Sequence, residues 1–376
     1  MPFWTHSPPG MKRMSSSDLN PPYRFSGMIR LLCMVFLPAV LGCGVFYSMI
    51  APTATQTPTA SLTPTATLTL TPEPTFTPTP TQIPTVCGGP PAMFILLAGS
   101  DSRKDSYAAG LADSIRLVRV DFVEPRIQLL PFPRDLYVEI PAIEDKSGIT
   151  HGKLNQAYLY GNSYYNYFDG PGEGPGLLAL TLEQNFGAQV DHYMAVNIQS
   201  LVRIVDKLGG IDIDLPYVID GRVPGSKDPN LYFVAGEQHL DGYRTMLLAR
   251  LRPEGDLQRI EVQNLILQAL TEKLFSLSAL REFPALIESL RDSVQTDLGP
   301  VEVGKLLCLS AMLDLQKIEF INFPDNLFKS DRVRDPVLGS TSILVADFEI
   351  LKKYVQNFNE GAWLQSVDDP EEGIQP

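Results

Sequence analysis

The chain has 376 residues, of which 44% are hydrophobic and 19% charged, so it is long enough for one large or two small domains with a real core. Its net charge at pH 7 is −13, whereas general nucleic-acid binders are usually basic, which argues against that class. The four cysteines form no CxxC pair and no Cys/His zinc spacing. An anionic ligand would therefore need a local cluster of Arg or Lys.

The first fifty residues predict a membrane anchor. Residues 1–30 are polar with a basic flank, and residues 31–50 are almost wholly apolar and uncharged. Such a run can cross a bilayer as a helix, and the basic flank predicts a cytoplasmic tail before it. The alternatives are a cleaved signal peptide and a lipoprotein signal that ends at Cys43. All three place the rest of the chain outside the cell membrane.

Thr and Pro dominate residues 51–86. A segment of this composition cannot bury enough apolar surface to fold, and its prolines favour extended polyproline II. We expect a disordered stalk here, followed by an extracytoplasmic domain over 88–358 and an acidic, flexible tail over 359–376.

Within this domain, apolar runs predict strands and helical spacing predicts helices. The expected strands are 93–98, 114–120, 126–130, 211–215 and 317–322, and the expected helices are 177–186, 201–208, 257–277, 279–292, 301–314 and 346–357. Strands alternating with helices predict an α/β fold with a central mixed sheet and helices on both faces.

Two cysteines, Cys87 and Cys308, lie at opposite ends of the domain. In an oxidising compartment they could pair, which would stabilise the fold by about 4–5 kcal/mol in the chain-entropy model. The alternative is two unpaired thiols.

Two carboxylates flank the first expected strands. Asp101 lies in the segment Gly99-Ser-Asp-Ser-Arg103, and Asp113 precedes the second strand. Carboxylates at strand ends of α/β domains commonly line the ligand crevice, and a pair of them suits Mg²⁺. The alternative is that both acids cap turns.

A basic cluster follows the third expected strand. Arg134 and Asp135 come directly after two prolines that stiffen the chain, and Lys153 and Asn155 add a cation and an amide. These residues predict a fixed loop that presents cations to a ligand. The alternative is a surface turn formed by Arg134 and Asp135.

The expected helix over 257–277 begins with a second basic cluster. Asp256, Arg259 and Gln263 are spaced to share one helix face. A different, apolar side is expected to carry Leu257, Ile260 and Ile266.

Just before this helix, Arg250 and Arg252 would point the same way if their segment were extended, as Pro253 favours. Helix N-termini and guanidinium groups both suit phosphate oxygens. The cluster therefore predicts an anion site, against the alternative of a solvated charged face. The four histidines form no triad, and neither a GxSxG elbow nor a phosphate-binding loop of the GxxxxGK type is present.

These motifs, in this order, resemble those of the LytR-CpsA-Psr family over roughly residues 92–357. The matching segments are GSDSR at 99–103, Asp113, FPRDLYVEIP at 132–141, KLNQAY at 153–158, LVRIVDKLGGIDIDLP at 201–216, LDGYRTMLLARLR at 240–252, DLQRIEVQ at 256–263 and TDL at 296–298.

The resemblance implies a phosphotransferase that moves a glycopolymer from a polyprenyl-pyrophosphate carrier onto a cell-wall acceptor such as peptidoglycan, with an apolar pocket for the lipid. It implies that Asp101 and Asp113 hold Mg²⁺. The implied catalytic residues are Arg134, Arg250, Arg252, Arg259 and Asp256, and the further pyrophosphate contacts are Arg103, Lys153 and Gln263. Asp135 or Asp256 would orient or deprotonate the acceptor hydroxyl.

The chain departs from the usual family pattern at Ala112, Gln258 and Val262, which bears on donor specificity and phosphate contacts. Two alternative functions stay open. One is a non-catalytic, regulatory module that binds polyprenyl phosphates or glycans, and the other is a lipid-pyrophosphate hydrolase that uses water as the acceptor.

Overall fold

The computed structural model describes residues 84–102, 107, 110–223, 225–252, 256–275, 294–335 and 337–363, all of which belong to the unit Pro78–Pro376. The expected cytoplasmic tail, anchor, most of the stalk, Arg103 and the helix over 279–292 lie outside these residues. Among the helices in the described ranges, none combines the length and the apolar character needed to cross a bilayer.

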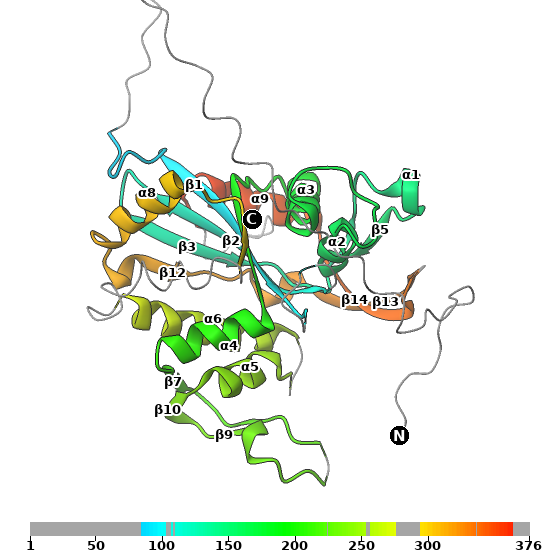
Figure 1. Ribbon diagram of the computed structural model, residues 1–376. Coiled ribbons are helices and arrows are strands. Elements are labelled where there is room, and N and C mark those ends of the chain that lie inside the picture. The colour runs from blue at the N-terminus through cyan, green and yellow to red at the C-terminus, as the bar shows by residue number, and fades with distance from the viewer. Residues whose placement is uncertain are drawn as a thin grey trace, which may run out of the picture. The chain divides into compact units, whose positions relative to one another are not determined.

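A six-stranded sheet forms the centre of the fold, in the order β11-β6-β1-β2-β3-β12 (Figure 1). The strands are β1 (Ala92–Ser100), β2 (Ala112–Asp121), β3 (Arg126–Pro131), β6 (His192–Asn197), β11 (Val294–Thr296) and β12 (Ile318–Phe320). β1 runs antiparallel to β2 and parallel to β6, and β12 is parallel to β3. The predicted mixed sheet is therefore confirmed.

One face of the sheet is covered by the helices α2 (Leu154–Gly161), α3 (Glu173–Phe186) and α9 (Phe348–Asn359). Alternate residues of β1, namely Phe94, Leu96 and Ala98, point into this layer and are at most 5% exposed. The period-two alternation of a strand sends their neighbours to the opposite face. These neighbours therefore face away from α2, α3 and α9.

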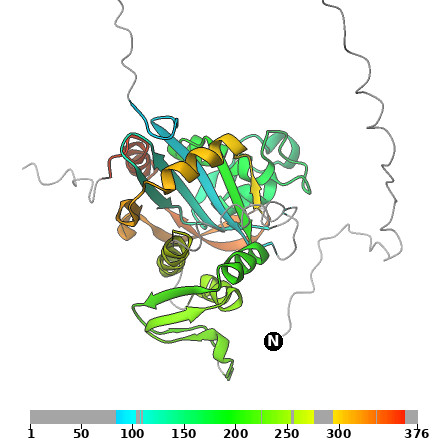
Figure 2. The ribbon, with the colours of Figure 1, turned by 60° about the vertical axis from the view of Figure 1, so that its left-hand side comes forward.

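The helix α8 (Pro300–Ser310) covers part of the opposite face and crosses in front of the strands in Figure 2. Helices therefore lie on both faces of the sheet, as predicted. Met93 and Ile95 of β1 pack there together with Leu309 of the helix. The sequence predicts a helix to residue 314, but α8 ends at Ser310, whose hydroxyl donates a 2.8 Å hydrogen bond to the Leu307 carbonyl.

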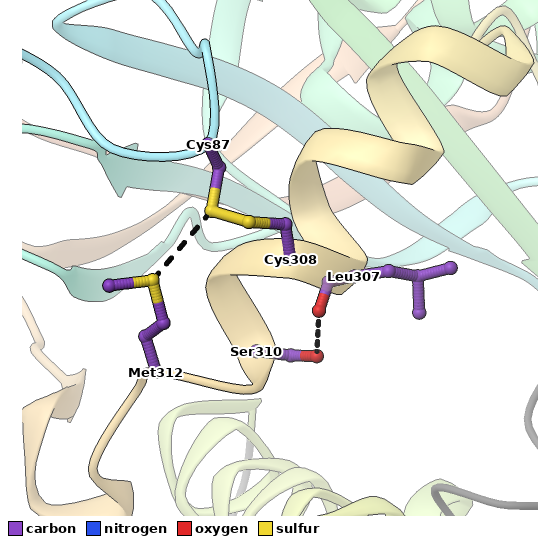
Figure 3. Close-up of a disulfide and its surroundings, with 5 residues drawn as sticks. All are labelled: Cys87, Leu307, Cys308, Ser310 and Met312. Carbon is purple, nitrogen blue, oxygen red and sulfur yellow. Dashed lines mark hydrogen bonds between the residues drawn. A yellow bond between two sulfur atoms is a disulfide. The ribbon is translucent and has the colours of Figure 1, made fainter.

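A disulfide joins Cys87 to Cys308 and so ties the segment that enters β1 to the last turn of α8 (Figure 3). The two cysteines are 221 positions apart in sequence. The Met312 sulfur lies 3.9 Å from the Cys87 sulfur and packs against the bridge. Of the two alternatives that the sequence left open, the structure has the paired one.

A second, smaller core lies below the sheet in Figure 1. It is built from α4 (Ile198–Lys207), α5 (Gly242–Arg250), α6 (Asp256–Leu274) and the hairpin of β7 (Ile211–Leu215) with β10 (Gly236–Leu240). Side chains of all five elements share this core, including Val205, Ile213, Leu240, Leu248 and Val262. The hairpin extends further through β8 (Ile219–Asp220), η1 (Pro229–Leu231) and β9 (Tyr232–Phe233).

The remaining elements are peripheral. They are β4 (Tyr137–Glu139), α1 (Glu144–Ser147), β5 (His151–Lys153), η3 (Leu315–Lys317), η4 (Asp325–Leu327), β13 (Lys329–Asp335) and β14 (Gly339–Val345). β4 pairs with β5, and β13 pairs with β14. The turn between β13 and β14 and the start of α2 line one cavity, so they lie near each other.

Candidate active site

A cavity of about 320 Å³ lies between the sheet and the helices α4, α5 and α6. Its polar end contains the ends of β1 and β2 and the start of α6. The charged and amide side chains there are Asp101, Asp113, Arg116, Asn197, Arg250, Arg259 and Gln263. Its other end is apolar, with Leu97 and Met194 from the sheet, Leu201 and Ile204 from α4, and Leu267, Leu270 and Leu274 from α6. One continuous cavity thus offers charge at one end and hydrocarbon at the other.

Asp101 and Asp113 both line the polar end. The pairing of β1 with β2 shifts register between Gly99 and Ser100, and a bulge of this kind re-aims the side chains that follow it. The Asp101 carboxylate accepts a 2.7 Å hydrogen bond from the Leu111 backbone N–H. Burial raises the pKa of Asp101 above its ordinary value, and the nearby charge of Asp113 acts in the same direction. The negative charges of Asp101 and Asp113 therefore interact electrostatically.

Three arginines gather around these two acids. Arg134, from the loop after β3, pairs with Asp113 at 2.5 Å, and Arg252 reaches the other oxygen of Asp113 at 3.7 Å. Arg250 lies near enough to lower the pKa of Asp101 electrostatically. Asp113 therefore holds two guanidinium groups at the mouth of the cavity.

The segment that carries Arg250 and Arg252 is only partly extended. Arg250 is the last residue of α5, and the next residue, Leu251, is extended, with φ −67° and ψ 146°. The expectation of an extended segment through all three residues is therefore wrong, because α5 continues to Arg250. Both arginines still face the acids, since the chain turns at Leu251.

Arg259 and Gln263 come from the first turns of α6, as the sequence predicts. Arg259 is only 2% exposed, and Gln263 donates a 3.2 Å hydrogen bond to the carbonyl of Ala249 at the end of α5. The sequence placed Ile266 on a different side of the helix, but Ile266 lines the same cavity. Arg259 and Ile266 are seven residues apart, which is nearly two full helical turns, so their side chains lie on the same face of α6.

Arg116 of β2 is a site residue that sequence reasoning missed. Its side chain is 1% exposed, and its guanidinium donates to Asn264 at 2.9 Å, to Gln263 at 3.3 Å and to the Ser114 hydroxyl. Burial and the neighbouring Arg259 lower the pKa of Arg116 to about 9, so the group stays charged at neutral pH. The available signal was a charged residue inside an otherwise buried strand, three positions after Asp113.

Arg116 and Arg259 therefore place two buried positive charges side by side. All the acceptors around Arg116 are neutral oxygens, which satisfy hydrogen bonds but do not cancel charge. A buried cation of this kind is costly unless an anion meets it. The polar end of the cavity is consequently suited to a strongly anionic group such as a phosphate.

Lys153 does not line this cavity. It lies instead beside Asp135, with 2.9 Å between the Lys153 ammonium and the carboxylate, and both border a second cavity. Arg134 approaches the other oxygen of Asp135 at 3.4 Å. Lys153 is thus linked to the arginine cluster through Asp135 and Arg134.

Arg103 lies outside the described residues, as does the side chain of Asp256, although α6 begins at that residue.

The acidic pair is suited to a hard cation that arrives with a phosphorylated substrate. Within the described residues, no group of three or more His, Cys, Asp or Glu side chains is placed to hold a metal ion. Magnesium at phosphate sites is usually held by one or two carboxylates together with water and phosphate oxygens, so Asp101 and Asp113 fit it. Asp113 would then share its charge between the ion and the guanidinium groups of Arg134 and Arg252.

Comparison with known proteins identifies the family. The sequence model of the LytR_cpsA_psr family matches residues 88–353, which includes every candidate site residue named above. The chain belongs to this family.

Two curated relatives of the chain are named as transferases. The chain is 27% identical over 211 residues to the polyisoprenyl-teichoic acid–peptidoglycan teichoic acid transferase TagV of Bacillus subtilis (strain 168), covering 55% of this chain and 50% of TagV. It is 28% identical over 247 residues to TagU of Bacillus cereus (strain AH820), which bears the same transferase name, covering 64% of this chain and 68% of TagU. The matches thus span between half and about two thirds of these relatives.

Solved structures share the fold. The crystal structure of B. subtilis TagV superposes with a TM-score of 0.55 at 23% identity, covering 72% of this chain and 97% of that one. Protein gbs0355 of Streptococcus agalactiae gives a TM-score of 0.56 at 18% identity, covering 73% and 90%. At these identities the likeness concerns the fold alone.

Proposed function

We propose that this LytR_cpsA_psr protein transfers a glycopolymer, with its linking phosphate, from a polyprenyl-pyrophosphate carrier onto a cell-wall acceptor, with peptidoglycan as the expected polymer. The observation that carries the proposal is the two-ended cavity. Arginines surround its polar end, and leucine, isoleucine and methionine side chains line the rest. A pyrophosphate joined to a prenyl chain has the same division into charge and hydrocarbon. The names of the relatives agree with this substrate pair.

In the reaction, an acceptor hydroxyl attacks the phosphorus that carries the glycan. A new oxygen–phosphorus bond forms, the bond from this phosphorus to the bridging oxygen breaks, and prenyl phosphate leaves with the electron pair. The hydroxyl proton passes to a carboxylate, for which Asp135 is placed beside Arg134 at the edge of the arginine cluster. The guanidinium groups of Arg134, Arg250 and Arg259 stabilise the charge that develops on the phosphate oxygens.

Mg²⁺ is the proposed cofactor, held by Asp101 and Asp113. When bound, it would neutralise phosphate charge and act as a Lewis acid. Removal of divalent ions with EDTA is expected to abolish turnover, and added Mg²⁺ to restore it. Full activity in EDTA would contradict the proposed metal.

We also propose that the domain works outside the membrane, held by the apolar segment 31–50 or by a lipid on Cys43, with residues 51–86 as the stalk. A prenyl-linked donor lies in a membrane, so an anchored enzyme would meet it there. Protease added to intact cells should then cleave the domain but spare the segment before residue 31.

The test of the transferase uses the full-length chain with a polyprenyl-pyrophosphate-linked oligosaccharide, and it measures the release of prenyl phosphate. Arg259→Met removes a buried charge that faces the cavity, and loss of one such stabilising group typically costs about 10²–10³-fold in rate. Arg332→Met, on the exposed strand β13, is the matched control and should keep full activity. Equal activity of the two variants would contradict the assignment of this cavity.

A further inference from the structure

A second cavity, of about 220 Å³, begins on the other side of Arg134. It is bordered by the start of α2, the segment that follows α2 and the turn between β13 and β14, which Figure 1 draws near one another. Arg134 belongs to its wall, whereas Asp113, the ion-pair partner of Arg134, lines the first cavity. The Arg134–Asp113 pair is therefore the boundary between the two.

This second cavity contains an unsatisfied polar atom. The Asn155 side chain is 3% exposed, and its carbonyl oxygen has no hydrogen-bond partner. The neighbouring Gln156 differs, because its oxygen accepts from the Lys153 backbone at 2.6 Å and its nitrogen donates to the Tyr160 hydroxyl at 2.7 Å. A buried acceptor without a donor costs about 1–3 kcal/mol, so a ligand with an O–H or N–H group would be favoured here.

One wall of the cavity is aromatic. Tyr160, Tyr165 and Tyr167 all line it, with ring centres 6.1 Å apart for Tyr160–Tyr165 and for Tyr160–Tyr167, and 5.5 Å apart for Tyr165–Tyr167. Tyr164 contacts Tyr165 at 5.2 Å but lies outside the cavity and is 68% exposed. Tyrosine rings offer flat apolar surface with a polar tip, which suits a ligand whose faces are apolar and whose edges carry hydroxyl groups.

The charged groups of the cavity are already matched to one another. Asp135 lies between Lys153 at 2.9 Å and Arg134 at 3.4 Å. The rest of the wall is apolar and includes Leu111, Ile149, Leu159, Val337 and Leu338. The cavity is smaller than the roughly 300–1,000 Å³ of pockets that enclose a whole drug-sized ligand, so it suits one part of a larger molecule.

We propose that this cavity is the acceptor subsite, and that it binds one uncharged sugar ring of the acceptor glycan. The ring packs against Tyr165 and Tyr167, and one of its polar hydrogens is donated to the Asn155 oxygen. A hydroxyl of the ring then lies toward Asp135 and the Arg134–Asp113 boundary, facing the phosphate end of the first cavity. This inference rests on the proposed transferase function and adds to it the place of the second substrate.

The direct test is glycan binding, which needs no turnover. Full-length wild-type chain is titrated with soluble, uncross-linked peptidoglycan glycan fragments, and the dissociation constant is measured by calorimetry. Tyr165→Leu/Tyr167→Leu should weaken glycan binding by about tenfold or more, since each aromatic contact contributes on the order of 1 kcal/mol. Tyr164→Leu is the matched control, because this tyrosine lies outside the cavity, and its binding should stay within about twofold of wild type.

A second variant distinguishes loss of the glycan site from misfolding of the chain. Leu338 is 51% exposed on the turn between β13 and β14, so Leu338→Trp should fill the cavity without disturbing the core. It should weaken glycan binding while leaving the affinity for a prenyl-pyrophosphate analogue unchanged. Glycan binding unaffected by both cavity variants, or equally lost in Tyr164→Leu, would overturn the inference, as would failure of the wild type to bind the fragments.

Failure of the proposed transferase is distinguishable from failure of this inference. Absence of donor turnover together with tyrosine-dependent glycan binding would contradict the transferase and support a glycan site at this place. Donor turnover with no tyrosine-dependent glycan binding would support the transferase and overturn the acceptor subsite.

Discussion

A single carboxylate, Asp113, organises the cations of the site. It accepts Arg134 on one oxygen and approaches Arg252 with the other. Without Asp113, the guanidinium groups of Arg134 and Arg252 would repel each other at this partly buried site. Asp113 therefore offsets the positive charges of Arg134 and Arg252 and holds the two side chains near each other.

Burial of the Asp101 carboxylate is expected to cost stability in the metal-free fold. Burial raises the pKa of Asp101 above 3.8 in the folded chain, so the folded state disfavours the ionised form. The cost grows as pH rises above 3.8 and is complete above the raised pKa, because the unfolded chain ionises first. In metal-free buffer, Asp101→Asn should therefore raise the Tm at pH 7 by on the order of 2 °C.

This gain in Tm should shrink as the pH is lowered through the raised pKa of Asp101, as measured by thermal unfolding between pH 7 and pH 4. The matched control is Asp331→Asn, since Asp331 is exposed and also accepts a backbone hydrogen bond, at 2.7 Å from Arg332. A Tm that falls in Asp101→Asn at pH 7 would show that the carboxylate stabilises the metal-free fold.

The residues that sequence predicted best are those in short local clusters. Arg259 and Gln263 are four residues apart on one helix, so their common face follows from helix geometry. Arg116 was missed because its role depends on α6 packing against β2, a contact between residues about 148 positions apart. Lys153 was assigned to the same phosphate site as Arg259, but the fold places it across Arg134, in the wall of the second cavity.

At the scale of elements, α6 joins the two ends of the first cavity. Its first turns carry Arg259 and Gln263, and its later turns on the same face carry Leu267, Leu270 and Leu274. A helix of 19 residues can thus present polar residues at its start and apolar residues further along the same face. If the cavity binds a prenyl chain as proposed, the length of α6 limits how much of that chain is covered.

Filling the apolar end of this stripe should change donor preference. Leu267→Trp adds bulk inside the cavity, so it should raise the KM for a long-chain polyprenyl donor by about tenfold, since each buried CH₂ contributes about 0.8 kcal/mol. A donor with a short prenyl chain should be affected less. Val301→Trp, at a position 64% exposed on α8, should change neither KM value. Equal loss for both donors would place the lipid elsewhere.

The disulfide is expected to stabilise the domain without serving catalysis. Cys87→Ser/Cys308→Ser removes a bridge that closes a loop of more than 200 residues, so the free energy of unfolding in urea should fall by about 3–5 kcal/mol. Reductant should bring the wild-type unfolding curve to that of the variant and leave the variant unchanged. Under native conditions, donor turnover should stay within about twofold, because α8 does not line the first cavity.

Among the elements, the buried strands and long helices were predictable, because β1, β2 and β3 are apolar runs and α3, α4, α6 and α9 show helical spacing. Among the short strands, β7 and β12 were expected, at 211–215 and 317–322, whereas β4, β5, β6 and β11 were not. The strand β6 and the helices α2 and α5 carry polar residues that only their neighbours explain, such as Gln156, which bonds to the Lys153 backbone and to Tyr160. The β13–β14 hairpin is mostly exposed and offers little apolar pattern.

In the domain as a whole, the two cavities lie against different elements of the fold. The face that packs against α4, α5 and α6 borders the long cavity proposed for the donor, and the region around α2 and the β13–β14 turn borders the aromatic cavity proposed for the acceptor. The Arg134–Asp113 pair connects them at the ends of β2 and β3. The chain carries a net charge of −13, yet Arg134, Arg250 and Arg252 lie near this boundary, where we propose that the two substrates meet.

The measurement that tests this account most directly follows the glycan-linked phosphorus. A polyprenyl-pyrophosphate donor carrying ³²P at the phosphate next to the sugar is incubated with the full-length chain, Mg²⁺ and acceptor glycan. Because the site gathers guanidinium groups, which suit phosphate oxygens, ³²P is expected in the acceptor polymer, and the released prenyl phosphate should be unlabelled. Recovery of all ³²P on the prenyl product would mean that a sugar–oxygen bond breaks instead, and would contradict phosphotransfer at this site.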